Sequence, residues 1–218
     1  GSQPNVYRGE TRVLQGTLEL AKDPGKNAFW GNLIIGNDVG GNDTAVVRLL
    51  AGDQIPSIDY FGINLTSVTV NSSGWLDFNG HSDTIGNLTL VEGQTYSADI
   101  TTGAGTLILG GASLTLTGAQ GSSPASPPAT ISGKLDLGSF FSGSGGGLTK
   151  TFNIGNSALA SVDADLVINA DISGTADVSL TRSGAGALTL AGNNTYAGPT
   201  ILTATGVTRI ASDSAFGT

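Results

Sequence analysis

The residues that could perform chemistry are few and lie far apart along the chain. There are 17 Asp and Glu residues, one histidine and no cysteine, so thiolate nucleophiles, thiolate metal sites and disulfides are excluded. General acid–base chemistry on a glycan needs two or three carboxylates on one face. The densest acidic group alternates with apolar residues, so members that share a strand should face solvent; it comprises Asp163, Asp165, Asp171 and Asp177. We therefore predict no catalytic residue and expect that the chain is not an enzyme.

Two turn-like segments resemble functional motifs only superficially. His81 stands two residues before Asp83, but a Ser-His-Asp triad is assembled in space rather than within one turn. Its neighbours Asn79-Gly80 and Ser82 favour a turn. Residues 36–43 resemble the glycine- and aspartate-rich calcium nonapeptide, which needs several stacked copies to complete each site. A plain surface turn is favoured for both segments, and we predict no metal-binding residue and no cofactor.

Glycine-rich stretches raise the possibility of phosphate loops. Neither Gly184-x-Gly186 nor the run at residues 143–147 is followed by helical periodicity, which a dinucleotide or phosphate fingerprint requires. We predict loop insertions near residues 119–130 and 138–148, which are the candidates if side loops bind a partner. Trp75 should face outward and is a candidate for carbohydrate contact.

Composition limits the class of protein. The chain has 218 residues, of which 34 are glycine, 39% are hydrophobic and 12% are charged. This hydrophobic content disfavours disorder, and there is no collagen period. The net charge of −8 disfavours nucleic-acid binding, which needs a basic surface. No apolar run approaches the ~20 residues of a membrane-spanning helix.

A short phrase of alternating apolar and polar residues recurs along the chain. It reads Gly-x-Leu-x-(Leu, Ile or Phe) and occurs at residues 16–20, 31–35, 74–78, 86–90, 105–109, 133–137 and 186–190, with looser copies at 113–116 and 165–168. Each copy predicts a short strand with one buried face. Such units must stack to bury that face, which indicates an all-β parallel β-helix, or β-solenoid, with coils of about 20–25 residues and irregular loops. A β-sandwich or antiparallel barrel should instead show several Asn-Gly or Asp-Gly hairpin turns, and only Asn79-Gly80 is present.

A longer repeat relates the two ends of the chain. Residues 7–11, Tyr-Arg-Gly-Glu-Thr, match residues 196–200, Tyr-Ala-Gly-Pro-Thr, at an offset of 189 residues, and residues 16–21 align with residues 206–211 at an offset of 190. We therefore expect residues 3–218 to form one β-helix domain that corresponds to about one ~190-residue unit of a larger array. Gly1-Ser2 is typical of the remnant left when an expression tag is removed.

Three segments resemble the autotransporter-associated β-strand repeat proteins of bacterial surfaces, also called passenger-associated transport repeats. These are residues 183–200, which contain Gly-Ala-Leu-Thr-Leu-Ala-Gly-Asn-Asn-Thr-Tyr, and residues 70–90 and 7–36. The resemblance implies a right-handed parallel β-helix that is secreted or displayed at the cell surface. Residues 203–210 depart from the family pattern because they are poor in leucine.

Two classes of function remain open. The first is a structural stalk or passenger segment that supports export, with adhesion as an additional role; the alternative is a carbohydrate-binding or carbohydrate-active β-helix. The expected partners are neighbouring repeats of the same chain, a second copy stacked end to end, and a surface glycan or host ligand. Nucleic acid and a membrane span in this segment are not expected.

Overall fold

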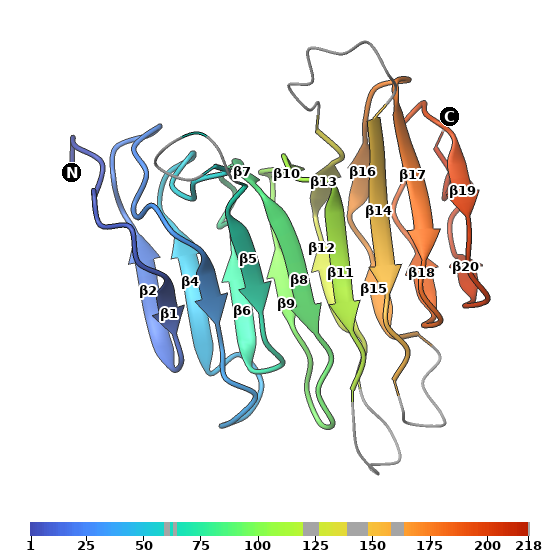
Figure 1. Ribbon diagram of the computed structural model, residues 1–218, viewed down its shortest axis with the longest axis horizontal. Helices are drawn as coiled ribbons and strands as arrows, with labels where there is room; N and C mark the ends of the chain where they lie inside the picture. The colour runs from blue at the N-terminus through green and yellow to red at the C-terminus, as the bar shows by residue number, and fades with distance from the viewer. Residues whose placement is uncertain (59–61, 63–64, 120–126, 139–147, 158–163, 218) are drawn as a thin grey trace.

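A computed structural model describes residues 1–58, 62, 65–119, 127–138, 148–157 and 164–217. Within this part of the chain the regular structure is β-strand, with no α-helix, and every strand pair within the sheets is parallel. The strands form two long sheets and one short sheet that run along the same axis (Figure 1). The prediction of an all-β parallel β-helix is confirmed.

The first long sheet contains every strand that opens a coil. In spatial order these strands are β1 (Thr11–Val13), β3 (Leu33–Ile35), β5 (Ser67–Val70), β8 (Asn87–Val91), β11 (Ser113–Thr117), β14 (Leu148–Ile154), β17 (Val178–Ser183) and β19 (Thr200–Leu202). Their spatial order follows their order along the chain, so each coil lies directly on the one before it.

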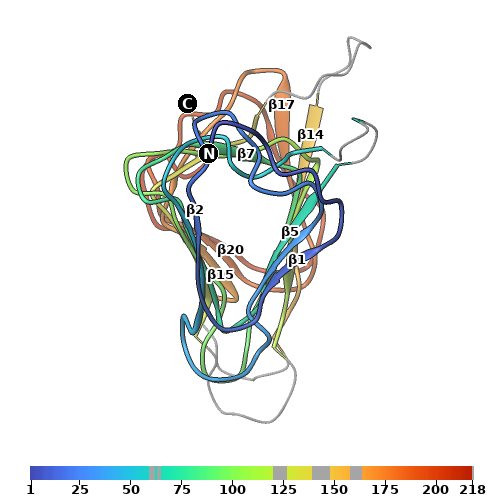
Figure 2. The ribbon, with the colours of Figure 1, turned by 90° about the vertical axis from the view of Figure 1, so that its left-hand side faces the viewer.

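The second long sheet repeats that order on the opposite side. Its strands are β2 (Gly16–Leu20), β4 (Ala45–Leu49), β6 (Gly74–Asp77), β9 (Asp99–Thr101), β12 (Ala129–Ser132), β15 (Leu166–Ile168), β18 (Leu188–Leu190) and β20 (Thr208–Ile210). The short sheet closes the third side over the middle coils, with β7 (Asp83–Ile85), β10 (Leu107–Leu109), β13 (Lys134–Asp136) and β16 (Asp171–Ser173). Viewed along the axis, the coils superpose as a triangle (Figure 2).

Coil length varies because the connections differ, while the strands stay in register. The ladder that begins at Thr11 continues through residues 33, 68, 88, 114, 152, 182 and 202. Its members are therefore 20 to 38 residues apart in sequence. Parallel strands are about 4.8 Å apart, so a longer coil carries its extra residues as a side loop. The predicted insertions at 119–130 and 138–148 fall largely outside the described residues.

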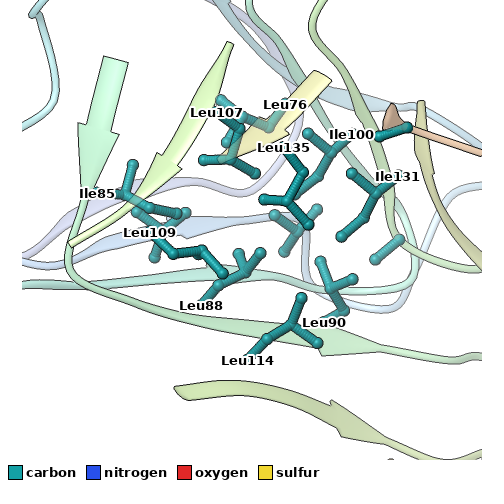
Figure 3. Close-up of a cluster of buried hydrophobic side chains, with 14 of the residues drawn as sticks. Leu76, Ile85, Leu88, Leu90, Ile100, Leu107, Leu109, Leu114, Ile131 and Leu135 are labelled. Atoms are coloured by element: carbon teal, nitrogen blue, oxygen red, sulfur yellow. The ribbon is translucent and has the colours of Figure 1, made fainter. Parts of the chain in front are cut away.

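The core consists of stacked aliphatic ladders. In the second long sheet one ladder runs through Leu18, Val47, Leu76, Ile100, Ile131, Ile168, Leu190 and Ile210. Its members from Val47 to Leu190 are at most 1% exposed. Figure 3 shows Leu76, Ile100 and Ile131 beside residues of the other two sheets, including Leu88 and Leu135. The alternation seen in the sequence thus points one side chain in two toward a single continuous core.

Tight corners explain part of the glycine content. Gly36 has a φ of 84° and Gly184 a φ of 85°, both in the left-handed region that glycine enters freely. A side chain at Gly184 would also collide with the carbonyl oxygen of Ile154 in the neighbouring coil. At such corners the chain turns from one sheet to the next while lying against the coil below.

Candidate functional site

A polar network on the outward face of the second long sheet is centred on Trp75. Its indole Nε1 donates a hydrogen bond to Thr101 Oγ1 at 2.9 Å, and the Arg48 guanidinium lies 5.6 Å from the ring centroid. Arg48 Nε also donates to Asp77 Oδ2 at 2.7 Å. The alternation Trp75 out, Leu76 in is as predicted. The indole is thus held in a network spanning β4, β6 and β9, with part of its surface covered by Arg48.

A hollow of about 420 Å³ adjoins this face. Its described lining exposes more apolar than polar surface, although most of the lining residues have a polar group: Asn42, Thr95, Tyr96, Ser97, Asp99, Pro127, Pro128 and Thr130. Asp99 accepts a hydrogen bond from Thr130 Oγ1. Burial raises the pKa of Asp99. Burial also raises the pKa of Asp43, with a smaller contribution from the charge of Asp99.

The hollow can offer hydrogen bonds and an aromatic ring to a small polar ligand. Among its described lining residues Asp99 is the one carboxylate. In the described part of the chain, no three His, Cys, Asp or Glu side chains are grouped closely enough to hold a metal ion.

His81 and Asp83 have different surroundings. His81 lies in the predicted turn, where its backbone N–H donates to the Phe78 carbonyl and the preceding Asn79 and Gly80 have positive φ. Asp83 is 1% exposed and turns into the core. One carboxylate oxygen of Asp83 accepts the backbone N–H groups of Gln54, at 2.6 Å, and Ile55, at 3.0 Å.

The turn at residues 36–43 is organised by its own polar side chains. Asp38 Oδ1 accepts the backbone N–H and the hydroxyl of Ser72, at 2.9 and 2.8 Å, and Asp38 and Asp43 both have positive φ. Asn42 Nδ2 donates to Asp43 Oδ2 at 2.7 Å. Asp38 thereby ties this turn to the next coil.

The acidic group at residues 163–177 contains both exposed and buried members. Asp171 and Asp177 are exposed, as predicted, and Asp163 lies outside the described residues. The prediction was wrong for Asp165, which is 1% exposed. Its two oxygens accept the backbone N–H groups of Ser157 and Ala187. The carboxylate is buried because it satisfies donors at a corner where strand pairing stops.

Two buried cations were missed by the sequence reasoning. Lys150 Nζ donates to the carbonyls of Leu109 and Gly111, at 2.7 and 2.8 Å, and burial lowers its pKa to about 8. Arg182 donates to the carbonyls of Gly184, Gly186 and Val207, and burial lowers its pKa. The carbonyl groups of Gly184 and Gly186 thus accept hydrogen bonds from Arg182.

Strand parity was the signal that could have identified these cations. Lys150 lies on the same face of β14 as Phe152 and Ile154, two and four residues away. Arg182 lies on the same face of β17 as Val178 and Leu180, so both cations stand at inward positions. At an inward position a positively charged side chain needs hydrogen-bond acceptors, which backbone carbonyls supply here.

A family model described as Passenger-associated-transport-repeat matches residues 180–210. The matched segment contains β18 and β20 together with β19 and most of β17. The suspected relationship to the autotransporter repeat family is thereby supported at the last two coils, including the leucine-poor residues 203–210. The fold is a parallel β-solenoid, and its residues 180–210 match the passenger-associated transport repeat.

The other comparisons add no relative. No curated protein and no solved structure matches the chain. In the described residues no helix is long and apolar enough to cross a membrane.

Proposed function

We propose that the chain is a structural passenger segment of a secreted or surface-displayed bacterial protein, and that it supports export. The observation that carries the proposal is an uninterrupted core ladder through eight coils, with the transport repeat at its last two. The function lies in the rod itself and uses no catalytic residue, metal or cofactor.

The physical basis for export is directional stacking. Each finished coil presents unpaired backbone groups and a row of aliphatic side chains to the residues that follow. A chain that emerges at the cell surface can then fold coil by coil on the preceding coil. Backward sliding of the chain would require a folded coil to come apart, so folding outside favours outward movement.

Surface display of a fusion tests this role. The chain is placed between a signal peptide and the membrane barrel of a bacterial autotransporter, and its exposure is measured by protease digestion of intact cells. We expect display of the folded segment at a level comparable to the native passenger. Retention of intact, folded segment inside the cell would contradict the proposal.

The carbohydrate-binding alternative is favoured by one feature, the hollow that contains Tyr96 and Asp99. An adhesive role would use this surface, with a surface glycan or host ligand as partner. Thermal melting in the presence of a glycan panel, with and without EDTA, tests it. The structural proposal predicts unchanged melting temperatures throughout. A glycan-dependent rise that disappears in Tyr96→Ala would establish binding, and release of reducing sugar from any glycan would overturn the non-catalytic assignment.

A further inference from the structure

The outward side of the first long sheet carries two rows of hydroxyl and amide side chains. The first row runs along the solenoid through Ser67, Asn87, Ser113, Thr151 and Thr181. The second row lies two residues further along each strand and runs through Thr69, Thr89, Thr115, Asn153 and Ser183. All ten side chains are half-buried or exposed. We call this surface the hydroxyl face, and it spans five adjacent strands in the middle of the sheet.

The hydroxyl face is uncharged although the protein as a whole is strongly acidic. None of its ten residues is charged, whereas 12% of the chain is charged and the net charge is −8. Two charged residues occur in its five strands, Lys150 and Arg182, and both point into the core. The outward rows of the second long sheet are different, because they include Arg48, Asp77 and Asp99. The hydroxyl face therefore suits a partner that is itself uncharged.

The spacing within the hydroxyl face is regular in two directions. Neighbouring coils are about 4.8 Å apart, and residues two apart on a parallel strand are separated by about 6.6 Å. A sheet of this size usually twists, but the coils of this solenoid superpose in the view along its axis (Figure 2), so the rows stay nearly straight. The result is a flat, rectangular net of polar groups. The prism face of hexagonal ice presents water molecules in a rectangular net of similar dimensions.

The side chains of the hydroxyl face have little freedom to lose when a partner binds. Ser113 Oγ donates a hydrogen bond to Asn87 Oδ1 at 3.1 Å, and Ser183 Oγ lies 3.4 Å from Asn153 Oδ1. Threonine, which supplies five of the ten residues, is branched at Cβ and has few rotamers. A hydroxyl group donates one hydrogen bond and accepts two, so it can stand in for a water molecule. Because ordered groups lose little entropy on binding, weak contacts add up across the face.

We propose that the hydroxyl face binds ice. Its hydroxyl groups and threonine methyl groups hold a layer of water that is shared with the surface of an ice crystal, and the five coils attach together. A soluble glycan suits this face less well, because pockets for small ligands are concave and rich in aromatic side chains. The hydroxyl face is flat, and none of its ten residues is aromatic. Ice binding goes beyond the proposed export role and does not depend on it.

Single lysine substitutions test the hydroxyl face. Thr89→Lys places a long charged side chain near its centre. Asn153→Lys, at an exposed position two coils away, is the second variant, which keeps the test valid if Thr89→Lys melts early. Val167→Lys is the matched control, because Val167 is an outward residue of the second long sheet. Circular dichroism melts establish that each variant is folded near the freezing point.

Two measurements report ice binding. The first is thermal hysteresis, the gap between the melting and growth temperatures of a single ice crystal, and the second is the fraction of protein captured by slowly growing ice. We expect the wild type and Val167→Lys to show a hysteresis that rises with protein concentration, to shape the crystal into facets and to enter the ice. Thr89→Lys and Asn153→Lys should lose the hysteresis and stay in the liquid.

Any of four results would overturn the proposal. A wild type without hysteresis that stays in the liquid at every concentration excludes ice binding. Lysine variants of the hydroxyl face that behave as the wild type place the contact elsewhere, and an equal loss in Val167→Lys shows that the added charge does not act through this face. Retention on insoluble cellulose or chitin that Thr89→Lys abolishes, without capture by ice, assigns the face to a crystalline polysaccharide. None of these results bears on surface display, so the proposed export function stands or fails separately.

Discussion

Replacing Asp83 with asparagine should remove a pH dependence from the stability of the solenoid. Asp83 opens β7, the edge strand of the short sheet, and stands in the same ladder as the buried Leu107 and Leu135. Burial raises its pKa to about 7, against the opposing effect of the backbone N–H groups of Ile55 and Gln54. The carboxylate is therefore harder to ionise in the folded protein than in the unfolded chain.

The sign and size of the effect follow from the two pKa values. The unfolded chain releases this proton above about pH 4, whereas the folded protein keeps it until about pH 7. The folded state thus binds more protons across this window, and the free energy of unfolding decreases as the pH rises. At about 1.4 kcal/mol per pH unit, the wild type loses about 3 kcal/mol between pH 5 and pH 8 through this group. The side chain introduced by Asp83→Asn would still accept the two N–H groups through its amide oxygen, but it has no proton to release.

Urea unfolding at several pH values between 5 and 8 measures this difference. The stability of Asp83→Asn minus that of the wild type should increase by about 3 kcal/mol from pH 5 to pH 8. Asp177→Asn, at an exposed position, is the control and should follow the wild type. A difference between Asp83→Asn and the wild type that is the same at pH 5 and pH 8 would refute the reasoning.

Two further predictions concern the core and can be measured by the same unfolding method. Ile100→Ala removes a side chain that is 0% exposed between Leu76 and Ile131 and should lower the free energy of unfolding by about 2–5 kcal/mol. Ile210→Ala, at an exposed position, should lower it by less than about 1 kcal/mol. Equal losses would contradict the ladder description. Arg182→Ala leaves the carbonyls of Gly184, Gly186 and Val207 without their donor and should cost about 3 kcal/mol. Lys134→Ala, at an exposed position of β13, is its control and should change stability by less than about 0.5 kcal/mol, so a neutral Arg182→Ala would show that these hydrogen bonds contribute no net stability.

The strands that repeat a leucine phrase could be predicted because alternation alone decides which face is buried. Residues 74–78 illustrate this: Leu76 and Phe78 are 0% exposed, and Trp75 faces outward as expected. β9, β16 and β19 were missed. They lack the leucine phrase that marked other three-residue strands such as β3 and β18, and their position depends on the coil beneath them.

The polar interior could be predicted only in part. The parity of Lys150 and Arg182 could have placed them inward, but the carbonyls that they bind lie 39 to 41 residues away for Lys150 and up to 25 residues away for Arg182. Asp83 likewise binds N–H groups 28 and 29 residues away. Such partners meet only once the number of residues in each coil is fixed, and irregular loops set that number. The hollow beside Tyr96 escaped prediction for the same reason.

The most direct test of the structural account compares two adjacent residues of β15 in the surface-display fusion. Ile168 is 0% exposed in the core ladder, whereas Val167 points outward in the same strand. Ile168→Asp buries a carboxylate and should break coil stacking, while Val167→Asp adds the same charge at the surface. If stacked coils support export, protease-accessible display falls strongly for Ile168→Asp and stays near the wild-type level for Val167→Asp. Equal display of both variants would contradict that claim.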